Sequence, residues 1–90
     1  MKMKVLVENE VVDYIKELPA KDQKVIGEHI SRLIEHPKAV GDIKRMITRT
    51  PRWRMHISSK YTVFYFVKDD TVYVDRIMTQ EQAHKKYGIF

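Results

Sequence analysis

The hydrophobic residues of this chain change their spacing once, near its middle. Residues 3–7 form a short run rich in β-branched side chains, which predicts a strand. Residues 10–18 and 21–35 repeat their hydrophobic side chains at helical spacing, which predicts two amphipathic helices. Pro19 lies in the short link between them, so the helices are expected to form an antiparallel hairpin. Gly27 lies inside the second helix, where we expect it to allow close packing against the first.

The second half of the chain has the spacing of strands. Strands are predicted at residues 43–48, 53–57, 61–67 and 72–77, with a hairpin turn at 68–70 and a short terminal helix at 79–87. Residues 61–67 carry hydrophobic side chains on both faces, which indicates a central strand covered on both sides. The order of elements predicts an α+β fold, in which the N-terminal strand and the helical hairpin pack on one face of an antiparallel β-sheet of three to four strands. The ninety residues are expected to form one domain, 1–90.

The positive charge of the chain is confined to one segment. The formal net charge is +5, yet residues 1–42 carry a net charge of −1 and residues 61–90 a net charge of zero. Residues 43–60 contain no acidic residue and six basic ones: Lys44, Arg45, Arg49, Arg52, Arg54 and Lys60. Charge this localised predicts a surface for a polyanion, most commonly a nucleic acid. Two alternatives remain open, a solvated face and a binding surface for an acidic protein partner.

The composition argues against several other classes of protein. The chain has no cysteine, which excludes disulfides and thiolate zinc sites. Its three glycines do not form a phosphate-binding loop, and its four histidines are scattered without clustered carboxylates, so we expect no metal and no cofactor. No hydrophobic run approaches the roughly 20 residues that span a bilayer. We therefore expect no membrane partner and a cytoplasmic location.

Arg54 and His56 are the strongest candidates for chemistry. If the three hydrophobic residues of the strand at 53–57 face the helices, Arg54 and His56 share the open face about 6–7 Å apart, and Arg52 continues the row. An arginine can hold a phosphate bidentately, and a histidine beside it can exchange a proton near neutral pH. This combination fits cleavage of RNA by attack of a 2′-hydroxyl on the adjacent phosphate. The alternative is that His56 is a bystander on a basic face.

The C-terminal segment adds a second group of candidates. Lys85 and Lys86 precede Tyr87, and basic residues at this position extend the expected nucleic-acid surface. Tyr87 is a candidate base in proton transfer and a candidate platform for stacking on a nucleobase. The alternative is that Tyr87 caps the hydrophobic core.

Three further residues have two interpretations each. Arg76 follows Asp75 in an otherwise hydrophobic strand, so it is either a site residue or one half of a surface ion pair. Phe64 and Phe66 are expected on the face away from the helices, where the terminal segment or a partner helix would have to cover them.

The order of these segments resembles that of the RelE/ParE toxin superfamily of toxin–antitoxin systems. A helical hairpin broken by a proline precedes a basic segment, followed by the alternating strand WRMHIS and the Tyr-led strand KYTVFYFV. The acidic turn KDD, the hydrophobic strand TVYVDRIM and the tail HKKYG complete the pattern. The resemblance covers nearly the whole chain.

The resemblance implies a small cytoplasmic toxin that is neutralised by a cognate antitoxin protein. RelE-like members cleave mRNA on the ribosome without a metal, whereas ParE-like members poison DNA gyrase. Arg54 and His56 match the two basic positions of the RelE-like pattern, and Tyr87 matches its tail tyrosine. RelE-like chains often carry Tyr-Arg at the start of the central strand, where this chain has Tyr61-Thr62.

The resemblance therefore predicts a ribosome-dependent mRNA endonuclease. Its expected catalytic residues are Arg54, His56, Arg76 and Tyr87, and its expected nucleic-acid-binding residues are Lys44, Arg45, Arg49, Arg52, Lys60, Lys85 and Lys86. The alternatives are a non-catalytic ParE-like gyrase inhibitor and a degenerate toxin that only binds antitoxin or RNA. A plain RNA-binding domain without toxicity is a third possibility.

Overall fold

The computed structural model describes residues 3–35, 43–46 and 52–87. Along the chain these residues form β1 (Lys4–Val7), α1 (Asn9–Lys16), α2 (Ala20–Arg32), β2 (Ile43–Met46), β3 (Arg52–Ile57), β4 (Tyr61–Lys68), β5 (Thr71–Thr79) and α3 (Gln80–Tyr87). The helical hairpin, the strands that follow it and the terminal helix lie where the sequence predicts them, with shifts of a few residues at their ends.

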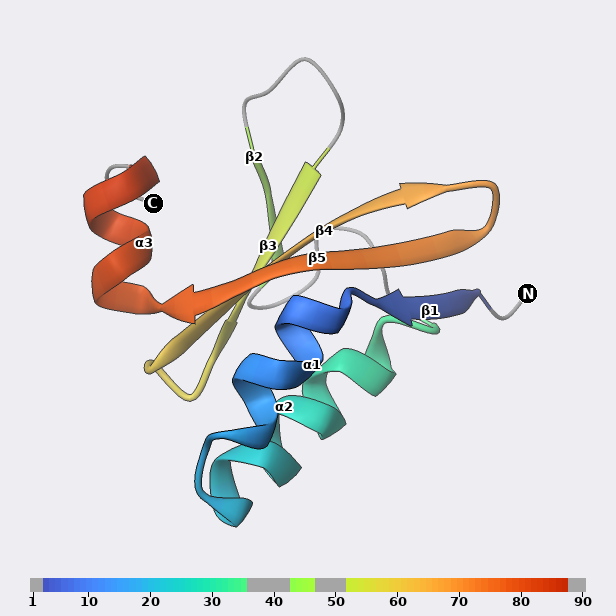
Figure 1. Ribbon diagram of the computed structural model, residues 1–90. Coiled ribbons are helices and arrows are strands. Elements are labelled where there is room, and N and C mark those ends of the chain that lie inside the picture. The colour runs from blue at the N-terminus through green and yellow to red at the C-terminus, as the bar shows by residue number, and fades with distance from the viewer. Residues whose placement is uncertain (1–2, 36–42, 47–51, 88–90) are drawn as a thin grey trace.

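The strands form one mixed sheet in the order β1-β5-β4-β3-β2 (Figure 1). The α+β prediction is confirmed, but the sheet has five strands in the described residues instead of the expected three to four, and it is not wholly antiparallel. The difference arises at β1, which pairs in parallel with β5, whereas the other neighbours are antiparallel. This pairing joins the two ends of the chain, so no local sequence pattern signals it.

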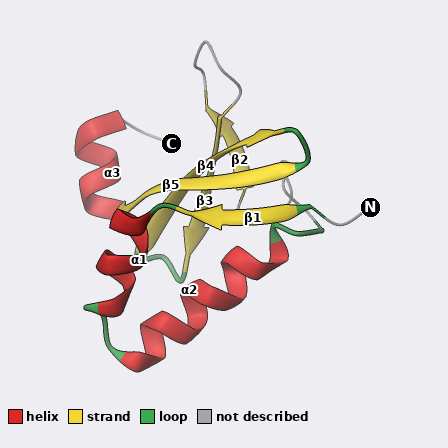
Figure 2. Ribbon diagram, turned by 45° about the vertical axis from the view of Figure 1, so that its right-hand side comes forward, coloured by secondary structure: helices red, strands yellow, loops and turns green. Residues whose placement is uncertain are grey.

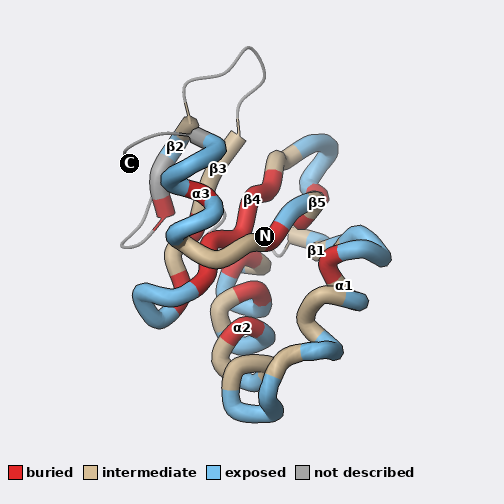
Figure 3. The backbone as a smooth tube through the Cα atoms, turned by 60° about the vertical axis from the view of Figure 1, so that its left-hand side comes forward, coloured by how far each residue is buried: buried red, intermediate tan, exposed pale blue. Residues whose placement is uncertain are grey.

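The helical hairpin covers one face of the sheet. Figures 1 and 2 show α1 and α2 side by side on this face and α3 apart from them, at the end of β5. The core between the layers unites Val11 of α1, Ile26 of α2 and Leu33, which caps α2, with strand residues such as Ile57 and Tyr65, all of them buried. Figure 3 shows buried stretches on α2 and on the central strands that face it. Each such side chain contributes about 1.5–3 kcal/mol on burial. The hairpin is therefore fixed to the sheet by its hydrophobic stripe, as the spacing predicts.

The link between the two helices is secured by a side chain from α2. The Gln23 amide donates hydrogen bonds to the carbonyl oxygens of Leu18 and Lys16, at 2.8 and 3.3 Å, and so satisfies groups that the end of α1 leaves open. Gly27 behaves differently from our expectation. It is exposed, and a Cβ built on it would meet nothing within 4 Å. The prediction that Gly27 allows close helix packing is wrong, because the helices do not approach each other there.

The terminal helix α3 covers part of the other face of the sheet. A reciprocal capping box begins it, since the Gln82 backbone N–H donates to Thr79 Oγ1 and the Thr79 N–H donates to Gln82 Oε1, at 3.2 and 3.1 Å. The helix packs against β4 and β5, and Ala83 and Phe64 are buried outside the main core. Strand β4 is thus covered on both sides, as predicted, and Phe64 is buried on the face that α3 partly covers.

Candidate functional site

A row of residues crosses four strands on the face opposite the helical hairpin. Lys44 on β2 pairs with Arg54 on β3, Arg54 pairs with Phe64 on β4, and Phe64 pairs with Arg76 on β5. We call the face that carries this row the open face, and α3 covers the part of it that lies over β4 and β5. Neighbouring residues in such a row lie about 5 Å apart, so the backbones of Arg54 and Arg76 are about 10 Å apart. The fold therefore brings Arg54 and Arg76 together across the central strand.

Arg76 reaches the open face because β5 contains a bulge. Val72 and Val74 face the core, so strict alternation would turn Arg76 inward as well. The register shifts instead between Phe64 and Tyr65, so that Arg76 pairs with Phe64 and Asp75 is the extra residue. The sequence contains a signal for this bulge, since the hydrophobic phase of β5 changes between Val74 and the buried Ile77.

Arg54 lies half-buried at the centre of the row. Its Nε atom is buried, and burial lowers the pKa of its guanidinium from the ordinary value. An arginine starts from a pKa far above neutral, so it stays charged in the physiological range. A charge in a partly dehydrated position attracts an anion more strongly than the same charge in water. Arg54 is thus suited to hold a phosphate at the floor of the open face.

His56 occupies the next row along the same face. It pairs in register with Thr62, and Thr62 pairs with Met78. His56 Nδ1 and Thr62 Oγ1 are hydrogen-bonded at 3.3 Å, and Thr62 is fully buried. The predicted pleat is confirmed, because the alternate residues Met55 and Ile57 belong to the core on the hairpin side.

The structure commits Arg52 to a protein partner. Its Nη2 donates to both carboxylate oxygens of Asp75, at 2.6 and 2.7 Å, and its guanidinium lies 5.5 Å from the ring centre of Phe66. Phe66 in turn stacks on Tyr73, with 4.9 Å between the ring centres. Asp75 on β5 therefore forms an ion pair with Arg52 on β3. In this arrangement the charge of Arg52 is neutralised within the protein and serves the fold.

Lys60 lies away from the open face. Its ammonium donates to Asp22 Oδ2 at 3.0 Å, and the Tyr61 hydroxyl donates to the same oxygen at 2.8 Å. These hydrogen bonds, that from Lys60 first, lower the pKa of the Asp22 carboxyl, although burial opposes them. Tyr61 belongs to the core on the hairpin side, so this cluster ties the β3–β4 turn to the start of α2. The structure does not bring Lys60 to Arg54.

The other predicted binding residues are dispersed. Arg45 is exposed and pairs in register with Trp53, which packs against the core, so Arg45 belongs to the hairpin side of the edge strand. Lys85 and Lys86 are exposed on α3, where Lys85 lies 3.7 Å from Glu81, a solvated pair of small energetic value. Three predicted features lie outside the described residues: the side chains of Lys44 and Tyr87, and the whole of Arg49.

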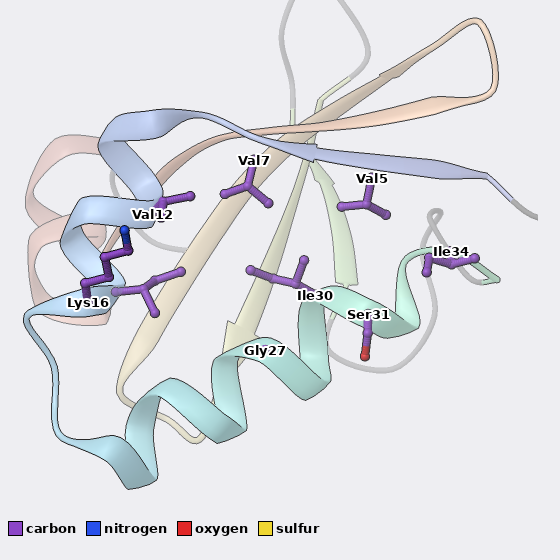
Figure 4. A pocket seen from close by; sticks show the side chains of 9 residues that line it. Val5, Val7, Val12, Lys16, Gly27, Ile30, Ser31 and Ile34 are labelled. Carbon is purple, nitrogen blue, oxygen red and sulfur yellow. The ribbon is translucent and has the colours of Figure 1, made fainter.

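Sequence reasoning missed a hydrophobic groove between β1, α1 and α2. Its volume is about 380 Å³, and its lining is almost wholly aliphatic (Figure 4). The lining residues are Val5, Val7, Val12, Ile15, Lys16, Gly27, Ile30, Ser31 and Ile34. A signal was present in the sequence, because α1 carries the hydrophobic residues Val12 and Ile15 in addition to the buried Val11. We assumed close packing of the helices and so left no room for the groove.

In residues 3–35, 43–46 and 52–87 no three His, Asp or Glu side chains gather where they could hold a metal ion. Within the same residues, every helix is too short or too polar to cross a membrane. The candidate sites with a distinct chemistry are thus the charged open face and the hydrophobic groove.

Comparison with known proteins gives a family and a fold. The sequence model of a family described as the ParE toxin of a type II toxin–antitoxin system, parDE, matches residues 5–84. No curated protein sequence matches the chain.

Several solved structures share the fold. RelE in the archaeal RelE–RelB complex from Pyrococcus horikoshii is 20% identical, with a TM-score of 0.78 over 92% of this chain and 100% of that chain. The RelB–RelE complex from Methanococcus jannaschii gives 19% identity and a TM-score of 0.68, over 91% and 98% of the two chains. The isolated E. coli RelE toxin gives 17% identity and a TM-score of 0.58, over 93% and 97%. At these identities the likeness is one of fold.

Proposed function

Because this chain belongs to the ParE toxin family of type II toxin–antitoxin systems, we propose that it is a toxin whose target is RNA. In this proposal the toxin cleaves mRNA on the ribosome by attack of a 2′-hydroxyl on the adjacent phosphate. A bond forms between the 2′-oxygen and phosphorus, and the bond from phosphorus to the 5′-oxygen breaks. The products are a 2′,3′-cyclic phosphate and a 5′-hydroxyl, so the reaction needs one group that accepts a proton and one that donates a proton.

The observation that carries this proposal is the arrangement of Arg54, His56 and Arg76 on the open face. Arg54 and Arg76 lie in one register row, on either side of Phe64. They would hold and neutralise the phosphates, because guanidinium groups stay charged and bind phosphate oxygens bidentately. His56, two residues along the strand from Arg54, would exchange a proton with the reacting oxygens. Tyr87 remains the sequence-based candidate for the second proton transfer.

An antitoxin would cover both candidate sites. RelE-like structures of this fold have been determined as RelE–RelB complexes. In this chain the aliphatic groove beside β1 fits a hydrophobic helix or strand of such a partner, and the cations of the open face fit an acidic segment. From the sequence, a partner helix was one candidate for covering Phe64 and Phe66. Phe64 is buried and offers no exposed surface to such a helix, which favours the groove.

A second candidate function is inhibition of DNA gyrase. It is favoured by the family description, which names ParE. It is also favoured by Thr62, a buried hydroxyl at a position where the RelE-like pattern carries an arginine. In that case the open face would bind a protein or DNA surface and would perform no chemistry.

Expression in cells separates the two candidates. We would induce the chain, map new 5′ ends in cellular mRNA, and assay the purified chain for inhibition of DNA supercoiling by gyrase. We expect mRNA cuts within codons and no inhibition of gyrase. Arg54→Ala and His56→Ala should each reduce cutting by about 100-fold or more, the range for loss of a phosphate ligand or a proton-transfer group.

Lys24→Ala provides the matched control, because it removes one exposed positive charge from α2 and leaves the open face intact. It should cut as the wild type does. Growth arrest that persists in both site variants, together with loss of gyrase supercoiling, would favour the second candidate.

A further inference from the structure

Thr62 and His56 form a cross-strand pair whose chemistry deepens the proposed function, on which this inference rests. The two residues are register partners on β4 and β3, and His56 Nδ1 lies 3.3 Å from Thr62 Oγ1. His56 is half-buried, whereas Thr62 is fully buried. The hydrogen bond thus joins a partly solvated imidazole to a hydroxyl inside the sheet.

Thr62 is a rigid anchor for this hydrogen bond. It lies on β4, which pairs with β3 on one side and β5 on the other and is covered by the hairpin and α3. A β-branched side chain in a strand has restricted freedom about χ1. A buried hydroxyl also needs a hydrogen-bond partner, because leaving it unsatisfied costs free energy. The position of Oγ1 is therefore fixed, and the imidazole has to orient toward it.

We propose that Thr62 is a positioning residue, which holds His56 Nδ1 so that Nε2 is the nitrogen that exchanges the proton during RNA cleavage. A neutral imidazole has two tautomers, and a threonine hydroxyl can either accept from Nδ1–H or donate to an unprotonated Nδ1. In the tautomer that we propose, Nδ1–H donates to Thr62 Oγ1. When Nδ1–H donates to Thr62 Oγ1, Nε2 carries the lone pair that accepts a proton. After it accepts the proton, the same Nδ1–H bond still holds the ring, so the orientation is kept in both states.

This role gives a physical meaning to a residue that departs from the RelE-like pattern. An arginine at position 62 would add a phosphate ligand, whereas the threonine adds an anchor for the histidine opposite. The cations then come from Arg54 and Arg76, which occupy the neighbouring row. His56 and Thr62 are thus one unit, and changing either should disturb the other.

Other charged groups surround this pair. Arg54 lies on the same strand and face, Arg76 lies on β5 in the neighbouring row, and α3, which packs on β4 and β5, carries Glu81, His84, Lys85 and Lys86. Their charges, as well as the hydrogen bond to Thr62, bear on the protonation of His56. The test therefore reads the tautomer and orientation of the ring directly.

Thr62→Val is the informative variant, because valine has nearly the same shape and lacks the hydroxyl. Two-dimensional ¹H–¹⁵N spectra of the histidine ring, recorded above the titration range, should show wild-type His56 with a protonated Nδ1 and an unprotonated Nε2. The valine variant should shift toward the opposite tautomer, and Thr62→Ser should restore the wild-type pattern. Ribosome-dependent cleavage should fall about tenfold in the valine variant and recover to within about threefold in the serine variant, as expected for loss of an orienting partner.

Thr71→Val serves as the control. Thr71 is also a buried threonine, and its hydroxyl donates to the Asp69 carbonyl oxygen, far along the sheet from His56. In the Thr71→Val variant, the spectrum of the His56 ring and the rate of RNA cleavage should match those of the wild type.

Three results would overturn the inference or its premise, and they can be told apart. An unchanged His56 spectrum in Thr62→Val would refute the anchoring bond. A changed spectrum with full cleavage in Thr62→Val, alongside loss of cleavage in His56→Ala, would refute the positioning role alone. Full cleavage in His56→Ala, or a wild-type chain that cuts no RNA, would refute the proposed function and with it the catalytic role of the pair. In either case the His56 spectrum would still show whether the hydrogen bond to Thr62 exists.

Discussion

Replacing Arg52 by methionine should reduce stability and leave RNA cleavage nearly unchanged. In the structure Arg52 Nη2 donates to both oxygens of Asp75 at 2.6 and 2.7 Å, and the two side chains are 28% and 27% exposed. A hydrogen bond to a charged group contributes about 1.5–3 kcal/mol, and partial exposure places this pair at the lower end. The cation–π contact with Phe66 adds about 0.5–1 kcal/mol.

We therefore expect Arg52→Met to lower the free energy of unfolding by about 2 kcal/mol. For a domain of this size such a loss lowers Tm by about 10 °C. Urea and thermal unfolding followed by circular dichroism would measure both quantities. A double-mutant cycle with Asp75→Asn isolates the ion pair, and its coupling energy should be about 1–2 kcal/mol. Arg32→Met, at the exposed end of α2, is the matched control and should change stability by no more than about 0.5 kcal/mol.

Two results would refute this account of Arg52. A coupling energy below about 0.3 kcal/mol would mean that the pair contributes nothing, which would contradict the short contacts of Arg52 Nη2 with both Asp75 oxygens. Cleavage that falls as far in folded Arg52→Met as in Arg54→Ala would place Arg52 among the phosphate ligands, contrary to its commitment to Asp75.

Three further changes test the fold and its electrostatics. Gly27→Ala should raise the free energy of unfolding by about 0.8–1 kcal/mol, because Gly27 is an exposed helix-interior residue with open space at its Cβ; thermal unfolding would measure the gain, and a loss would mean that the groove closes over this position. Asp70→Gly should stabilise the β4–β5 turn by about 0.5 kcal/mol, because Asp69 and Asp70 have φ of 51° and 57°; Asp70→Ala is the control and should destabilise it. The lowered pKa of Asp22 stabilises the fold, and Asp22→Asn should remove this contribution. The contribution is present above the pKa of about 4 that an aspartate has in the unfolded chain, and it is lost as the pH falls through the lower pKa of the folded chain. The difference in unfolding free energy between wild type and Asp22→Asn should thus be largest at neutral pH and shrink in acid, and a constant difference would contradict the hydrogen bonds from Lys60 and Tyr61.

The local patterns of the sequence predicted most of the elements and the pleat of β3. Alternation alone placed Arg54 and His56 on the open face, since period two is a property of any strand. Helical spacing likewise predicted the hairpin and the side it buries. The RelE/ParE resemblance, which the family match confirms, rested on the order of these same elements.

The partners of the charged residues could not be predicted from the sequence. Arg52 appeared as one more phosphate ligand, yet the bulge in β5 turns Asp75 toward it, and Asp75 is 23 positions away in the chain. Lys60 appeared as a nucleic-acid-binding residue, yet it meets Asp22 on the hairpin side, 38 positions away. Such pairings depend on register between distant strands and helices, which local spacing does not encode. The same is true of β1, whose partner β5 lies at the other end of the chain.

The central claim is that Arg54, Arg76 and His56 on the open face cleave RNA, and the chemistry of the cut end tests it most directly. Purified toxin would be added to ribosomes that carry a defined mRNA, and the 3′ end of the upstream fragment would be identified by mass spectrometry. We predict a 2′,3′-cyclic phosphate from the wild-type chain and from Lys24→Ala, and intact mRNA from Arg54→Ala and His56→Ala. Intact mRNA with the wild-type chain, combined with loss of gyrase supercoiling activity, would contradict the claim.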